Sequence, residues 1–170
     1  MIDTINSMSN EAVKQDFHRC CASTQWVEQM VNARPFTSVD HLHDVAVEIW
    51  KALSDSDYLE AFEGHPMIGA DIEALRAKFT HTSAWSEGEQ SGVQSASEDV
   101  LRRLQQANIE YLNRFGYIFI VCATGKTAAE MLDLLEARLH NPPELEIGIA
   151  AGEQQKITAI RLNKWLETLA

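Results

Sequence analysis

The sequence is short of positive charge. Its 170 residues carry 14 Lys and Arg against 25 Asp and Glu, which gives a formal net charge of −11. Proteins that bind nucleic acids or anionic membranes present cationic surfaces, so this composition argues against both partners, and alone it does not favour an anionic substrate. No stretch approaches the roughly 18 apolar residues of a membrane span. Met1–Asn6 also lacks the basic and apolar regions of a signal peptide.

Cysteine is scarce as well. The chain has three cysteines, an odd number. Cys20 and Cys21 are adjacent, which disfavours a bridge between them, and Cys122 lies inside an apolar run. Reduced, mostly buried thiols are the simplest expectation, and together with the absence of a recognisable targeting signal they point to a cytoplasmic protein.

Proline and glycine are few, with 4 and 8 residues, and apart from Gly148 and Gly152 they fall near the boundaries of the expected elements or in loops. The rest of the composition is that of a folded protein, with 45% hydrophobic and 23% charged residues, which argues against a mainly disordered chain. The length suits one globular domain. We expect it to span residues 1–170 and to bury about 70% of its extended-chain surface.

Apolar residues recur at spacings of three and four over most of the chain, which is the period of amphipathic helices. Ser23, Ser38 and Thr127 are suited to cap helix N-termini, and Gly64 and Gly116 are suited to end helices. The pattern predicts helices around residues 13–21, 24–34, 39–53, 58–64, 68–79, 96–115, 128–140 and 145–169.

Two segments break the helical period. Residues 80–98 are polar; within them Ser86-x-x-Glu89 and Ser95-x-x-Glu98 match a capping box, so a short helix can begin at the first and a longer one at the second. Tyr117–Cys122 is strand-like. Because no convincing second strand can pair with it, we expect either a buried extended segment or a helix whose sequence resembles that of a strand. The predicted fold class is all-α, a single compact multi-helix domain without a significant sheet.

Two further motifs are weak. Gly125-Lys126-Thr127 resembles the end of a phosphate-binding P-loop, but Ile120 stands where that motif needs its first glycine, so Thr127 is better explained as a helix cap. His41-Leu42-His43 offers two imidazoles without the spacing of a known zinc site, and a solvated first helical turn is the simpler interpretation. The sequence therefore favours neither a nucleotide-dependent enzyme nor a metal centre.

Three features can carry chemistry. His65 stands between Gly64 and Pro66, and Pro66 pushes it into an extended conformation. Its imidazole can serve as a general acid or base on this rigid corner, or it can be a surface turn histidine. Residues 86–90 can be a plain helix cap or an anion site at a helix N-terminus. Arg161 stands on an apolar helix face, where it needs a carboxylate or a ligand as its partner.

Four motifs follow one another along the chain. They are Phe62-Glu63-Gly64-His65-Pro66-Met67-Ile68-Gly69; Ser86-x-x-Glu89-Gln90; Asn108-x-x-Tyr111-x-x-Arg114-Phe115-Gly116-Tyr117-x-Phe119-Ile120-Val121-Cys122-Ala123; and Glu153-Gln154-x-Lys156-Ile157-x-x-Ile160-Arg161-Leu162. In this order they resemble the family of 2-oxo-4-hydroxy-4-carboxy-5-ureidoimidazoline (OHCU) decarboxylases, its bacterial branch most, over Phe17 to Leu166. One departure is Met67, where many members carry Arg or another polar residue.

The resemblance implies an all-helical, cofactor-free decarboxylase that forms (S)-allantoin in the third step from urate. It also implies a homodimer, a small anionic ureidoimidazoline substrate and no metal. The family's catalytic histidine, glutamate and arginine match His65, Glu89 and Arg161. The implied substrate contacts are Pro66, Ser86, Glu87, Gly88, Gln90, Phe119, Ile120, Val121, Cys122 and Ala123.

The chemistry fits these residue types. Loss of carbon dioxide leaves an electron pair that the substrate ring and its C=N bond can absorb, so no cofactor is needed. We expect His65 to exchange a proton, Glu89 to orient His65 or bind the ureido group, and Arg161 to hold negative charge. The extended backbone of 119–123 would meet the polar edges of the ring. The alternative is a non-catalytic helical module for small-molecule binding or interaction, in which Arg161 pairs with an internal carboxylate.

Overall fold

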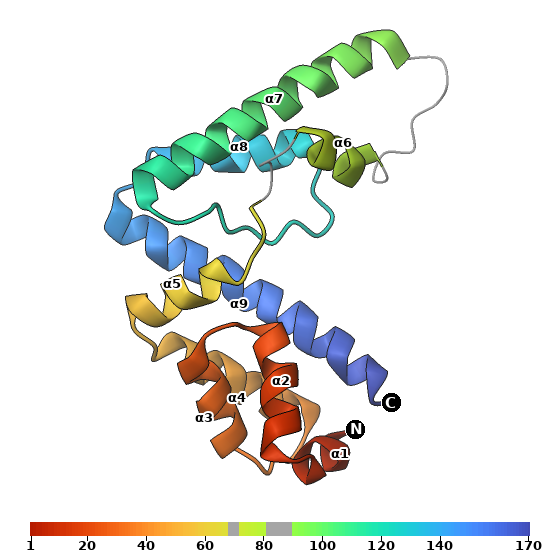
Figure 1. Cartoon of the computed structure of the whole chain (residues 1–170), viewed down its shortest axis with the longest axis vertical. Coiled ribbons are helices and arrows are strands. Elements are labelled where there is room, and N and C mark those ends of the chain that lie inside the picture. The colour runs from red at the N-terminus through yellow and green to blue at the C-terminus, as the bar shows by residue number, and fades with distance from the viewer. Residues whose placement is uncertain (68–71, 81–89) are drawn as a thin grey trace. The chain divides into compact units, whose positions relative to one another are not determined.

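The computed structural model describes residues 1–67, 72–80 and 90–170, and every regular element within these ranges is a helix (Figure 1). The helices are α1 (Ile2–Ser7), α2 (Asn10–Cys20), α3 (Thr24–Asn32), α4 (Val39–Lys51), α5 (Asp55–Glu63), α6 (Ile72–Thr80), α7 (Gln90–Phe115), α8 (Ala128–Leu139) and α9 (Pro143–Thr168). The predicted all-α class is confirmed. None of the described helices combines the length and apolarity needed to cross a bilayer.

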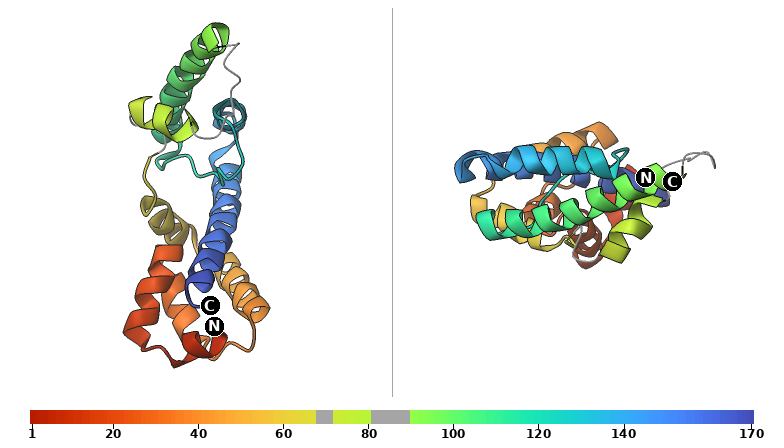
Figure 2. Two further views of the ribbon diagram at one scale, coloured as in Figure 1. Left: turned by 90° about the vertical axis from the view of Figure 1, so that its right-hand side faces the viewer. Right: turned by 90° about the horizontal axis from the view of Figure 1, so that it is seen from above.

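The chain divides into two compact units. Unit 1 consists of Met1–His65, Ile120–Cys122 and Ile149–Ala170, and unit 2 consists of Pro66–Phe119 and Ala123–Gly148. Helix α9 therefore contributes its start to unit 2 and the remainder to unit 1. Both chain ends belong to unit 1, where Figures 1 and 2 show them close together.

In unit 1, helices begin where the sequence predicts caps. The hydroxyl of Ser23 accepts a hydrogen bond from the backbone N–H of Trp26 at 3.3 Å, and that of Ser38 accepts one from His41 at 3.0 Å. Each bond satisfies one free N–H group of a first helical turn and stabilises its helix by about 1 kcal/mol. The short helix α1 was not predicted, because its 6 residues are too few to establish a helical period from the sequence.

The core of unit 1 is aromatic. The ring of Phe17 in α2 is fully buried and meets Trp26, Phe36 and Trp165 edge-on, with ring centres 5.8, 6.4 and 5.4 Å away. Such pairs add about 0.5–1.5 kcal/mol each to the burial of apolar area. The indole N–H of Trp26 donates to the carbonyl of Ala46 at 3.0 Å, so that α3 is also tied to α4.

In unit 2, α7 and α8 lie side by side (Figures 1 and 2). Both contribute fully or almost fully buried apolar side chains, namely Leu101, Leu104, Met131 and Leu135. These residues recur at spacings of three and four on their helices, which is the stripe that the sequence pattern predicts.

The start of α7 differs from the prediction. The helix begins at Gln90, so the Ser95-x-x-Glu98 box lies inside it and opens no helix. The carboxylate of Glu98 instead accepts two hydrogen bonds from the guanidinium of Arg76 in α6, at 2.6 and 2.8 Å. A contact between helices thus uses the side chain that a local rule assigned to a cap. The Ser86-x-x-Glu89 box lies outside the described residues.

The start of α9 differs by a smaller amount. The helix begins at Pro143 rather than near Leu145. A proline is tolerated in the first helical turn, because its missing N–H would have no partner there and its fixed φ suits a helix.

The strand-like run Tyr117–Cys122 belongs to no helix and pairs with no strand in the described part of the chain. It follows Gly116, which ends α7 with φ +81°, a left-handed conformation that favours glycine. The side chains of residues 119–122 are buried, so the segment is buried, as expected, and the alternative of a helix is wrong. Thr127 then caps α8 in a reciprocal box with Glu130, at 2.8 and 3.2 Å. The cap interpretation of Thr127 is therefore confirmed.

Candidate active site

His65 lies at the corner that follows α5. Gly64 caps the helix with φ −71° and ψ −3°. The backbone N–H groups of Gly64 and His65 donate to the carbonyls of Ala61 and Phe62, at 3.2 and 3.1 Å. Pro66 follows and prevents the helix from continuing. The half-buried imidazole therefore stands at the non-helical corner that the sequence predicts.

Both ring nitrogens of His65 face side chains of α9. Nε2 lies 2.5 Å from Oε1 of Gln154, and Nδ1 lies 3.3 Å from Nη2 of Arg161. Gln154, Thr158 and Arg161 follow one another at spacings of four and three, so they share one helix face. The fold thus brings together two of the predicted catalytic residues, which are separated by 96 positions in the sequence.

Gln154 is a site residue that the sequence analysis missed. Its side chain is 0% exposed, and its Nε2 donates to Oγ1 of Thr158 at 3.1 Å. Thr158 also hydrogen-bonds the thiol of Cys21, which follows α2. The last sequence motif contains Gln154 without assigning it a role. An uncharged amide in the middle of an apolar helix face was the available signal, since a buried amide needs partners.

The surroundings of His65 lower its pKa below the ordinary value of 6.5. Burial is the largest cause, because it disfavours the charged imidazolium. The hydrogen bond to Gln154 acts in the opposite direction, and the positive charge of Arg161 lowers the pKa further. At neutral pH the imidazole is therefore uncharged, which is the form that can accept a proton.

Arg161 has no carboxylate within ion-pairing distance among residues 1–67, 72–80 and 90–170. Two thiols lie in its field: burial raises the pKa of Cys20 to about 12 and of Cys21 to about 11, and the charge of Arg161 opposes both shifts. The internal salt bridge that the binding-module alternative requires is thus missing from the described chain. A guanidinium beside a neutral histidine is suited to hold an anionic ligand.

The other predicted contact residues are distributed over both units. Unit 1 contains Ile120, Val121 and Cys122 together with His65 and Arg161, and unit 2 contains Pro66, Phe119 and Ala123. Gln90 is the first residue of α7. The predicted residues Ser86, Glu87, Gly88 and Glu89 lie outside the described residues, so the role of Glu89 stays a prediction.

Within unit 2, a buried charged cluster holds Phe119. The guanidinium of Arg138 lies 4.5 Å from the ring centre of Phe119, and its Nε donates to Oε1 of Glu146 at 2.6 Å. The hydroxyl of Tyr111 donates to the same oxygen at 2.5 Å, and the amide of Asn141 donates to Oε2 at 2.9 Å. Burial and the bond to Glu146 raise the pKa of Tyr111 well above its ordinary value, so it remains a donor. The sequence did not predict this cluster.

His41 and His43 have separate local partners. Nδ1 of His41 accepts a hydrogen bond from the backbone of Thr37 at 3.1 Å, and Nε2 of His43 lies 2.8 Å from Oδ1 of Asn163. Within the described ranges, no group of three or more His, Cys, Asp or Glu side chains is placed to hold a metal ion.

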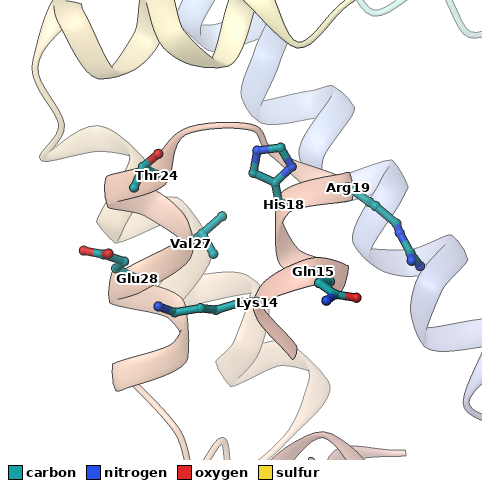
Figure 3. A pocket seen from close by; sticks show the side chains of 7 residues that line it. All are labelled: Lys14, Gln15, His18, Arg19, Thr24, Val27 and Glu28. Atoms are coloured by element: carbon teal, nitrogen blue, oxygen red, sulfur yellow. The ribbon is translucent and has the colours of Figure 1, made fainter. Parts of the chain in front are cut away.

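An open groove of about 510 Å³ lies between α2 and α3 of unit 1. Figure 3 shows Lys14 and His18 of α2 along it, with Lys14 extending toward Glu28 of α3. The groove contains none of the predicted site residues, and its mixed charges favour no ligand of one sign. The candidate active site is therefore the pair His65 and Arg161 rather than this groove.

Comparison with known proteins identifies relatives along almost the whole chain. A family model described as OHCU decarboxylase matches residues 6–163. The uric acid degradation bifunctional protein TTL of Arabidopsis thaliana is 37% identical over 159 residues, which are 92% of this chain and 48% of that protein. The OHCU decarboxylase of Mus musculus is 33% identical over 134 residues, 78% of this chain and 74% of the mouse protein. The chain thus spans about half the length of the plant relative.

Two solved structures share the fold. A structure of OHCU decarboxylase in the presence of (S)-allantoin matches with a TM-score of 0.72 and 35% identity, covering 94% of this chain and 99% of that one. A structure of (S)-allantoin synthase matches with a TM-score of 0.68 and 17% identity, covering 96% and 53%, which supports the fold alone. Helical architecture, the family model and the mouse relative agree: the chain belongs to the OHCU decarboxylase family.

Proposed function

We propose that this chain catalyses the decarboxylation of OHCU to (S)-allantoin, the third step of urate degradation, without a cofactor. Family membership and the related structure solved with (S)-allantoin support this substrate class. The single observation that carries the proposal is the position of Arg161, which lies 3.3 Å from Nδ1 of His65 and has no carboxylate partner in the described chain. One residue can hold an anion while the other moves a proton.

The reaction defines what the site must do. The substrate carries a carboxylate and a hydroxyl group on one ring carbon. When the bond to the carboxylate breaks, its electron pair forms a new C=C bond, and the electrons of the adjacent C=N bond move to nitrogen, which takes up a proton. The resulting enol then loses its hydroxyl proton and gains a proton on the neighbouring ring carbon. A single enantiomer results only if that last proton arrives from one face.

The residues divide these tasks. His65 accepts the hydroxyl proton and returns a proton to the ring carbon, a role that contributes typically about 10²–10⁴-fold to rate. Arg161 holds the negative charge of the substrate and of the developing enolate with permanently charged donors. In the same proposal, Glu89 orients His65 or binds the ureido group. The backbone of residues 119–123 and the other predicted contact residues then surround the ring.

We further propose that the protein acts in the cytoplasm, as its expected reduced thiols suggest, and that it forms a homodimer, as its resemblance to the family implies. Size-exclusion chromatography with light scattering should then give twice the chain mass of 19.1 kDa. A mass of one chain at micromolar concentration would refute the dimer and leave the proposed reaction standing.

The decisive experiment generates OHCU in the cuvette from urate, with urate oxidase and the hydrolase that precedes decarboxylation, and follows the formation of allantoin by circular dichroism. The wild-type chain should accelerate the appearance of the circular dichroism signal and yield an excess of (S)-allantoin. With His65→Ala the rate of decarboxylation should fall to within about tenfold of the spontaneous rate, because the acid–base contribution is lost. His43→Ala is the matched control, since His43 bonds Asn163. Racemic allantoin at the spontaneous rate from folded wild-type protein would favour the non-catalytic binding module.

A further inference from the structure

The two contacts of the His65 ring specify which nitrogen carries its proton. A guanidinium has only donors, so Nδ1, which faces Nη2 of Arg161 at 3.3 Å, must present its lone pair. A neutral imidazole carries a single N–H, which must then be on Nε2. That N–H needs an acceptor, and Oε1 of Gln154 lies 2.5 Å from it.

The amide of Gln154 is itself oriented. Its NH₂ group donates to Oγ1 of Thr158 at 3.1 Å, and the side chain is 0% exposed, so water cannot replace either partner. Rotating the amide by 180° would point its NH₂ group at Nε2 of His65. Both ring nitrogens would then face donors, and neither could carry the proton of the neutral ring. One arrangement therefore satisfies all the side chains of this chain of hydrogen bonds.

We propose that Gln154 is a positioning residue for the decarboxylation: it holds His65 as the Nε2–H tautomer, so that Nδ1 is the nitrogen that takes up and returns the substrate's proton. This inference rests on the proposed function of His65. In the resting protein Arg161 occupies the lone pair of Nδ1. When the substrate carboxylate draws the guanidinium away, that lone pair becomes free for the hydroxyl group, so anion binding prepares the base.

A glutamine suits this task better than a carboxylate would. Its neutral oxygen fixes the tautomer but stabilises an imidazolium less than a charged partner does. The imidazole consequently stays uncharged at neutral pH beside Arg161, the charged group that faces it within the described chain. Glu89 lies outside the described residues.

The first test reads the tautomer directly and does not depend on turnover. Long-range ¹H–¹⁵N correlation spectra of the uniformly labelled full chain at pH 7.5 distinguish protonated from unprotonated ring nitrogens. His65→Asn identifies the signals of His65 among the six histidines. We expect a protonated Nε2 and an unprotonated Nδ1. A protonated Nδ1, or an average of both tautomers, would overturn the proposal.

The second test separates positioning from a merely structural role. Gln154→Leu removes the acceptor at similar volume and should lower kcat about 10–100-fold with KM changed less than about threefold. Gln154→Glu keeps an acceptor; it should restore most of kcat and move the acid limb of the pH–rate profile to higher pH, because a carboxylate stabilises imidazolium. Gln155→Leu is the matched control, since Gln155 lines a separate pocket with Trp50 and Leu162.

The outcomes are distinguishable. Wild-type kcat in Gln154→Leu, or an unmoved acid limb and no rescue in Gln154→Glu, would refute the positioning role while the proposed function stands. If wild-type protein forms no excess of (S)-allantoin, the proposed function fails, and the spectra of the resting protein still decide the tautomer. Should Gln154→Leu not fold, the comparison of Gln154→Glu with wild type carries the same decision.

Discussion

The corner before His65 offers a test in which tertiary contact decides the sign of the effect. Gly64 has φ −71°, which alanine adopts without strain, so Gly64→Ala should by local rules stabilise the chain by about 0.4–1 kcal/mol through its unfolded state. In the fold, however, the new Cβ would lie 2.6 Å from Cβ of Ala22 and 3.2 Å from the carbonyl oxygen of Ala61. The first distance is far below van der Waals contact, so the end of α5 must move.

The magnitude follows from these two opposing effects. Overpacking costs about 1–3 kcal/mol, and after the local gain is subtracted we expect a net loss of about 1–2 kcal/mol. For a chain of this size, that lowers Tm by about 2–8 °C. Because Gly64 directly precedes His65, the shift also moves the imidazole. A 1 Å error can cost about 100-fold in rate, so a few tenths of an ångström should lower kcat about 3–10-fold.

Urea denaturation and the coupled allantoin assay measure the two effects. The double variant Ala22→Gly/Gly64→Ala lacks the 2.6 Å contact. In the Ala22→Gly background, Gly64→Ala should therefore cost much less stability and activity than it does in wild type. If Gly64→Ala proves as stable as wild type, or if the double variant recovers nothing, the steric reasoning is wrong.

Three further predictions concern buried charge, pH and thiols. Arg138→Met leaves the carboxylate of Glu146 buried without its cation and should lower the free energy of unfolding in urea by about 3–5 kcal/mol. A decrease below about 1 kcal/mol would contradict a buried ion pair between Arg138 and Glu146. Because the pKa of His65 is lowered in the fold, its contribution to stability is full above about pH 6.5 and is lost as the pH falls below that value. Wild type should therefore lose more stability than His65→Asn between pH 7.5 and 5. Equal losses would contradict the lowered pKa. Burial raises the pKa of Cys20 to about 12 and of Cys21 to about 11. Iodoacetamide at pH 8 should therefore label both thiols in denaturant but not in the folded chain, as measured by peptide mass spectrometry. Rapid labelling of the folded chain would refute their burial.

The caps show how far local rules extend. Ser23, Ser38 and Thr127 could be predicted as helix caps because each bonds a backbone group three residues away. The same rule failed at Ser95-x-x-Glu98, since Glu98 pairs with Arg76, 22 positions earlier in the sequence. No local pattern contains that partner.

The sequence by itself determined what depends on neighbours in the chain: the helical class, most helix boundaries and, through the order of four motifs, the family and the candidate residues His65 and Arg161. Only the tertiary structure decided how these residues act on each other. Gln154 and Arg161 stand 89 and 96 positions from His65, and their contacts exist only where the corner after α5 meets one face of α9. Desolvation and a neighbouring charge set the protonation of the imidazole there, and both arise only when the chain is folded.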